Sequence, residues 1–237
     1  MNLKEHYNKL YNDSIQRIQT DSYQIDDLID SDSDSRFGIT LLLRPDHRVK
    51  EEIQKFLNKI KRIEPEQYYY QNSDLHVTVM SIISCYNGFD LSQIKIEDYI
   101  KIIRRSIDEL RSFDIEFRGL TASPSCLMVQ GFLKDDTLNQ IRSNLRNNFK
   151  NSDLEQSLDK RYAIQTAHST IFRLKKKLDN KEKFLRTIEE YRDHYFGIFK
   201  VNTLELVFND WYQRKEYVKT LHRFELKNSS TILQTKF

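Results

Sequence analysis

Apolar residues recur at helical spacing in five segments of the chain. A pattern of apolar residues three and four positions apart predicts an amphipathic helix with one buried face. Shorter runs, either continuously apolar or alternating, predict strands. The predicted helices cover 1–20, 49–63, 99–110, 138–149 and 184–191, and the predicted strands cover 36–45, 75–83, 113–120, 125–132, 163–174, 201–208 and 217–226.

These elements mix helices with strands joined by polar turns, which predicts an α+β protein of seven or eight strands and four or five helices. The strands at 113–120 and 125–132 are separated by TASP, so we expect a β-hairpin there. The acidic IDDLIDSDSDS segment that ends at Ser35 is too polar to bury and predicts a linker or mobile loop. We therefore divide the chain into an N-terminal helix with its linker (1–35), a globular part (36–227) and a loose polar tail (228–237).

Composition restricts the class of protein further. A hydrophobic fraction of 38% with 31% charged residues is typical of a globular chain. No apolar run approaches the roughly 18 residues of a membrane helix, and the N-terminus lacks the apolar core of a signal peptide. The two cysteines, Cys85 and Cys126, lack metal-finger or redox spacing, so we expect reduced thiols in a cytoplasmic protein. We also expect a monomer. A net charge of +3 argues against a protein that coats long nucleic acids, while a short nucleotide or RNA end stays compatible.

A repeated motif carries the candidate chemistry. Two segments predicted as strands contain the pattern His-x-Thr-apolar, at His76-Val77-Thr78-Val79 and His168-Ser169-Thr170-Ile171. Residues two apart in a strand project from the same face, so each histidine lies beside its threonine. One copy in a strand usually has no function. Two of only six histidines share the pattern, however, and an internal repeat would bring the two strands together around a pseudo-twofold centre.

The residue types fit phosphodiester chemistry without a metal. Such a reaction needs a base for the attacking oxygen, an acid for the leaving oxygen, and donors that hold the anionic oxygens. Histidine suits both proton roles near neutral pH, and threonine hydroxyls can donate to the non-bridging phosphate oxygens. The sequence therefore predicts His76, Thr78, His168 and Thr170 as catalytic, and it does not indicate which histidine is the acid.

With this doubled motif the chain resembles the two-histidine (2H) phosphoesterase superfamily, which includes LigT-like 2′-5′ RNA ligases and cyclic nucleotide phosphodiesterases. The resemblance covers roughly residues 36–227. It implies a bilobal fold with two pseudo-symmetric antiparallel sheets around a central cleft and helices packed outside. In many LigT-like members an arginine follows the second histidine by five residues, and Arg173 has that place here. The MSIISCY sequence after the first motif departs from the aromatic and glycine of many relatives.

Three further residues are candidates for substrate binding. Arg173 could hold a phosphate oxygen, although an arginine before a lysine-rich stretch is often only a solvated strand end. Phe172 and Trp211 could stack on a base, and packing in the core or at its rim is the alternative for each. The remaining histidines, His6, His47, His194 and His222, do not repeat the motif.

We find no metal-ligand spacing, no glycine-rich phosphate loop and no nucleophile elbow, so we expect no metal and no cofactor. The leading hypothesis is a phosphodiesterase for a 2′,3′-cyclic phosphate or a 2′-5′ linkage of a nucleotide or RNA end. RNA ligation would be the reverse reaction. A module that binds nucleotides or RNA ends without turnover is the alternative, and a scaffold with purely structural histidines is a third.

Overall fold

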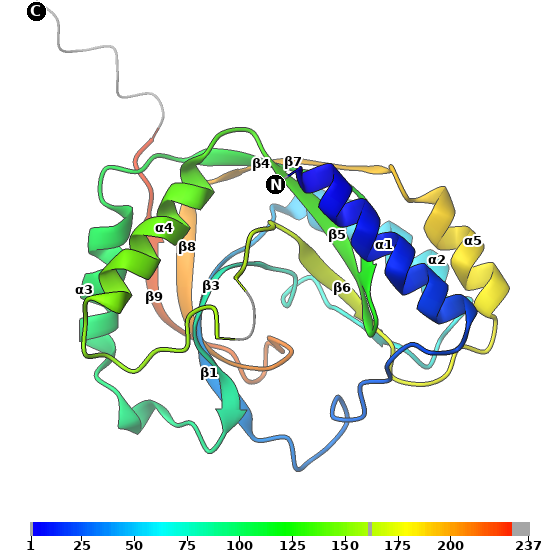
Figure 1. Cartoon of the computed structure of the whole chain (residues 1–237), viewed down its shortest axis with the longest axis horizontal. Helices are drawn as coiled ribbons and strands as arrows, with labels where there is room; N and C mark the ends of the chain where they lie inside the picture. The colour runs from blue at the N-terminus through cyan, green and yellow to red at the C-terminus, as the bar shows by residue number, and fades with distance from the viewer. Residues whose placement is uncertain (1, 161–162, 229–237) are drawn as a thin grey trace, which may run out of the picture.

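A computed structural model of the chain describes residues 2–160 and 163–228. Five α-helices and nine strands occur in this part, together with a short 3₁₀ helix at Leu91–Gln93. The strands form two antiparallel sheets, which lie between two groups of helices (Figure 1). The predicted α+β class with two antiparallel sheets is confirmed.

The four-stranded sheet has the order β3-β1-β8-β9 and contains the first motif. Its central strand β1 is the continuous apolar run of the sequence, and its side chains from Ile39 to Leu43 are buried. The last two strands of the chain complete this sheet, so its members come from both ends of the globular part. The four strands are β1 (Arg36–Leu43), β3 (Val77–Asn87), β8 (Thr203–Asp210) and β9 (Lys219–Glu225).

The five-stranded sheet has the order β2-β6-β5-β4-β7 and contains the second motif. The predicted hairpin is confirmed as β4 and β5, which pair from Ile115 opposite Leu133 to Ser123 opposite Cys126. Strand β6 pairs with β5 and, on its other side, with the two-residue strand β2. The five strands are β2 (Tyr68–Tyr69), β4 (Phe113–Ser123), β5 (Cys126–Leu133), β6 (Ser169–Arg173) and β7 (Tyr195–Val201).

All five predicted helices are present. Two of them, α3 and α4, pack together beside the four-stranded sheet, whereas α1, α2 and α5 pack beside the five-stranded sheet (Figure 1). The N-cap carboxylate of Asp46 accepts a hydrogen bond from the Val49 N–H at 2.9 Å, which fixes the start of α2. The helices are α1 (Leu3–Gln19), α2 (His47–Lys61), α3 (Ile96–Ile107), α4 (Thr137–Lys150) and α5 (Lys181–Glu190).

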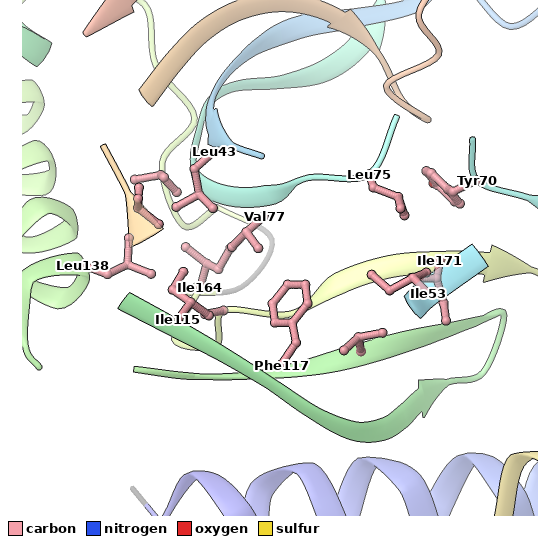
Figure 2. Packing of buried hydrophobic residues seen from close by; sticks show 14 of the residues in the cluster. Leu43, Ile53, Tyr70, Leu75, Val77, Ile115, Phe117, Leu138, Ile164 and Ile171 are labelled. Atoms are coloured by element: carbon pink, nitrogen blue, oxygen red, sulfur yellow. The ribbon is translucent and has the colours of Figure 1, made fainter. Parts of the chain in front are cut away.

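The buried residues form a cluster that includes side chains from both sheets. Figure 2 shows Leu43 and Val77 from the four-stranded sheet near Ile115, Phe117 and Ile171 from the five-stranded sheet. Because the two sheets share a core, each holds the other in place. The relative position of the two motifs is therefore a property of the packed core.

Strand β7 was not predicted as a strand. Its sequence is YFGIFKV, in which Phe196, Phe199 and Val201 are buried while Tyr195 and Ile198 are exposed. The spacing of the buried residues changes at Gly197, where φ is +127°. This irregularity breaks the two-residue period that a strand prediction requires.

The acidic segment at 25–35 does not behave as a free linker. The Asp26 N–H donates to the Leu174 carbonyl oxygen at 2.8 Å, and the Asp26 carboxylate accepts from the Arg173 guanidinium at 3.2 Å. The Ile29 side chain is only 1% exposed. The prediction that this segment is too polar to bury is therefore wrong, because basic residues of the body pair with its acidic ones and Ile29 packs inside. The predicted loose tail, 228–237, lies outside the described residues apart from Asn228.

Candidate active site

The first motif lies at the start of β3. His76 immediately precedes the strand, and Thr78 is its second residue. Val77 and Val79 are fully buried in the core, whereas His76 and Thr78 point from the opposite face and are half-buried. The predicted alternation is confirmed for this copy.

The second motif has the same arrangement in β6. Ser169 and Ile171 are fully buried, while His168 and Thr170 are half-buried on the opposite face. The two strands β3 and β6 contact each other although they belong to different sheets. Figure 1 shows β3 and β6 facing each other in the middle of the molecule.

A pocket of about 180 Å³ lies between the two sheets and brings the two motifs together. Both motifs contribute their histidine and their threonine to its walls. The predicted site residues that line it are His76, Thr78, His168, Thr170, Arg173 and Trp211.

The ring of His76 is oriented by a backbone carbonyl. Its Nδ1 lies 2.7 Å from the Asp74 carbonyl oxygen. A carbonyl only accepts, so Nδ1 carries the proton and donates it to Asp74, which leaves Nε2 for proton exchange. Burial lowers the pKa of His76 to about 4, opposed by the hydrogen bond to Asp74.

The ring of His168 is oriented by a hydroxyl instead. Its Nδ1 lies 2.6 Å from the Thr166 Oγ1 atom. Burial lowers the pKa of His168 to about 4, and the positive charge of Arg142 adds to this effect. Both imidazoles are consequently neutral at pH 7 in the free protein, and an anionic ligand would raise both pKa values.

Arg142 of α4 connects the two motifs through their backbones. Its Nε donates to the Val79 carbonyl oxygen at 3.0 Å, and its Nη2 donates to the carbonyl oxygens of Thr78 at 2.9 Å and Thr166 at 2.8 Å. The residue is 1% exposed. One guanidinium thus ties the strand of the first motif to the segment that leads into the second.

Two of the three predicted substrate-binding residues line the pocket. Arg173 does so, but its Nε donates to the Tyr70 hydroxyl at 3.0 Å and its Nη1 pairs with Asp26. Trp211 also lines the pocket, with the Arg36 guanidinium 4.7 Å from its ring centroid.

The third residue, Phe172, does not line the pocket. Its side chain has no exposed surface and packs against Tyr69 and Phe184 in the core. In a regular strand it would share the face of Thr170, but the pairing of β5 with β6 shifts register between these two residues. A base cannot stack on a fully buried ring, so the predicted role of Phe172 is wrong.

Sequence reasoning missed several polar residues of the pocket wall. Thr40 and Ser81 are partners across β1 and β3, and each interrupts an apolar run, which was a usable signal. Asn209 and Gln213 lie on either side of Trp211, where nothing in the sequence marks them. Arg142 was also missed, because an arginine on a predicted amphipathic helix is normally assigned to the solvated face.

Among residues 2–160 and 163–228, no group of three or more His, Cys, Asp or Glu side chains is placed to hold a metal ion. In the same part of the chain, no helix is both long and apolar enough to cross a membrane.

Comparisons with known proteins agree with this architecture. Residues 39–226 match the family model of the AKAP7 2′5′ RNA ligase-like domain. No curated protein matches the sequence significantly.

Solved structures of similar fold are distant in sequence. TT0787 of Thermus thermophilus aligns over 82% of this chain and 99% of its own, with a TM-score of 0.60 and 14% identity. E. coli LigT, in a structure complexed with 3′-AMP, aligns over 81% of this chain and 99% of its own, with a TM-score of 0.53 and 10% identity. At these identities the likeness concerns the fold. The family match covers most of the chain, and this chain therefore belongs to the AKAP7 2′5′ RNA ligase-like domain family, within the 2H phosphoesterase superfamily.

Proposed function

We propose that this protein is a metal-independent phosphodiesterase for a ribose-linked phosphodiester, either a 2′,3′-cyclic phosphate or a 2′-5′ linkage of a nucleotide or RNA end. One observation carries the proposal: two His-x-Thr pairs, from two different sheets, line one pocket. The family consists of 2H phosphoesterase-type domains, which fits RNA phosphodiester cleavage or ligation.

The proposed reaction uses all four side chains. A water attacks the phosphorus while one neutral imidazole takes its proton at Nε2. The bond from phosphorus to the leaving ribose oxygen breaks, and the other imidazole, protonated at Nε2, gives its proton to that oxygen. Thr78 and Thr170 donate to the non-bridging oxygens as negative charge develops there.

The environments of the two rings favour His168 as the base and His76 as the acid. The carbonyl oxygen of Asp74 stabilises a charged imidazolium at His76, since it accepts the Nδ1 proton in both protonation states. His168 has only a hydroxyl at Nδ1. Positive charges oppose protonation of both rings, Arg44 and Arg173 at His76 and Arg142 at His168, so the carbonyl at His76 is the difference between the two environments. A bound phosphate would therefore favour protonation of His76 over protonation of His168.

A substrate screen tests the proposed function. The protein is assayed with excess EDTA on 2′,3′-cyclic nucleotides and on 2′-5′ and 3′-5′ linked dinucleotides. Turnover of a cyclic phosphate or a 2′-5′ dinucleotide is expected, with little on the 3′-5′ isomer. Nucleotide binding without any turnover would favour a binding module instead. Activity that EDTA abolishes and zinc or magnesium restores would contradict the proposed mechanism.

A further inference from the structure

The segment 20–35, between α1 and β1, runs from the side of the five-stranded sheet across to the four-stranded sheet (Figure 1). It lies outside the part of the chain that matches the family, since that match begins at residue 39. The Asp26 N–H donates to the Leu174 carbonyl oxygen at 2.8 Å. Because Leu174 directly follows Arg173, this bond places the Asp26 side chain beside an arginine that lines the pocket.

The Asp26 carboxylate contacts one residue from each side of the pocket. Its Oδ1 accepts from the Tyr212 hydroxyl at 2.8 Å, and its Oδ2 accepts from Arg173 Nη1 at 3.2 Å. Tyr212 follows β8 of the four-stranded sheet, whereas Arg173 ends β6 of the five-stranded sheet. The side chains of Asp26 and Arg173 are each only 14% exposed, so solvent screens this ion pair weakly.

The guanidinium of Arg173 is held at two of its three nitrogens. Besides the bond from Nη1 to Asp26, Nε donates to the Tyr70 hydroxyl at 3.0 Å. The Cζ atom lies 5.4 Å from the centroid of the Tyr212 ring. A guanidinium is planar, so fixing two nitrogens also fixes the direction of the third.

The third nitrogen, Nη2, is available to a ligand. Of the described residues 2–160 and 163–228, none accepts a hydrogen bond from it. It is not a buried atom, so a ligand in the pocket can reach it. Arg173 lines the same pocket as His76 and His168. An anionic phosphate oxygen is the acceptor that best suits a guanidinium N–H at this place.

We propose that Asp26 is a positioning residue that, together with Tyr70, fixes the Arg173 guanidinium so that Nη2 donates to a non-bridging oxygen of the substrate phosphate. A donor whose direction is set before the substrate arrives needs no reorganisation as charge develops on the phosphate. The segment that precedes the family match thereby contributes to the site. The catalytic meaning rests on the proposed function, whereas the order of the guanidinium is a property of the resting protein.

The kinetic test compares Asp26→Asn with Asp30→Asn in the full chain. Asp30 is the matched control, because it lies in the same segment, is 64% exposed and pairs with Lys175 instead. Asp26→Asn should lower kcat by about 10-fold, less than the roughly 10²-fold that a misplacement of about 1 Å can cost. KM should change less than kcat, because Arg173 keeps its charge. Asp30→Asn should keep wild-type values.

A double-variant cycle separates positioning from a purely structural role. If Asp26 acts through Arg173, Asp26→Asn should lower kcat by less than about 2-fold in an Arg173→Met background. An equal loss of kcat in both backgrounds would overturn the inference. If Asp26→Asn fails to fold, Tyr70→Phe replaces it, since this variant removes the other contact of Arg173 and should give a similar loss.

Nitrogen-15 relaxation of the Arg173 Nε–H group tests the inference without turnover. The group should be ordered in the wild type and in Asp30→Asn, and mobile in Asp26→Asn. Inorganic phosphate should shift its signal in the wild type. Unchanged order in both Asp26→Asn and Tyr70→Phe, or no shift with phosphate, would overturn the inference. Lost order in Asp26→Asn and a phosphate shift in the wild type, in a protein that cleaves no phosphodiester, would support the inference and refute the proposed function.

Discussion

Replacing Arg142 with methionine removes the guanidinium that joins the two motifs while keeping an unbranched side chain of comparable reach. Three hydrogen bonds are lost, to the carbonyl oxygens of Val79, Thr78 and Thr166. Bonds from a charged donor are worth about 1.5–3 kcal/mol each, or roughly 5–9 kcal/mol together. The substitution also removes the several kcal/mol that burial of an ion costs. The free energy of unfolding should therefore fall by about 2–4 kcal/mol.

Denaturant unfolding monitored by circular dichroism and by fluorescence of Trp211, the one tryptophan of the chain, measures this change. Arg186→Met in α5 is the control, since Arg186 is exposed and its replacement should change the unfolding free energy by less than about 0.5 kcal/mol. Arg142→Lys should cost at least as much as Arg142→Met, because lysine still buries a charge but cannot reach three carbonyls.

Arg142→Met should also lower kcat in the fraction of the protein that remains folded. A misplacement of about 1 Å between reacting groups can cost about 10²-fold, and Arg142 holds the backbones that carry both histidines. The reasoning is refuted if Arg142→Met unfolds within about 0.5 kcal/mol of the wild type, as Arg186→Met is expected to do.

Three further predictions follow from the two imidazoles and their threonines. The leaving group of a nitrophenyl phosphodiester needs no acid, so on this substrate His76→Ala should lose little activity and His168→Ala should lose most of it. The reverse order would make His76 the base and His168 the acid. Because burial lowers both histidine pKa values to about 4, the form with one protonated ring becomes more populated as pH falls from 7, so kcat/KM should rise towards about pH 5. Bound phosphate raises those pKa values, so kcat should have its optimum at a higher pH than kcat/KM. Equal pH optima of kcat and kcat/KM in steady-state measurements would contradict this prediction. On a substrate with a ribose leaving group, Thr78→Ala and Thr170→Ala should each lower kcat by about 10- to 10³-fold, less than either histidine variant; full activity in both would refute their role as phosphate donors.

Local patterns were enough to locate the two motifs and most elements. The two-residue period places His76 beside Thr78 and buries Val77 and Val79 behind them, and the same period holds around His168. These relations depend only on neighbouring residues in one strand. Sequence patterns therefore predicted them correctly.

Relations between distant segments could not be predicted in this way. Arg142 is separated from Val79 by 63 residues, and Tyr7 from Gly131 by 124, so no local pattern reveals their contacts. Phe172 looked available for stacking because it adjoins the motif, but its ring direction depends on strand pairing in the five-stranded sheet. The acidic segment looked too polar to pack on the body because its counter-charges, such as Arg173, lie far along the chain.

Turnover of the best substrate by His76→Ala, His168→Ala and the double variant, in EDTA, tests the central claim most directly. His222→Ala is the control, because His222 lies in β9 and does not line the pocket between the sheets. Each single variant of the motif histidines should lose about 10²- to 10⁴-fold in kcat, and the double variant should lose far less than the product, since the two rings act as one unit. His222→Ala should keep wild-type turnover. Near wild-type turnover by both His76→Ala and His168→Ala would contradict the account.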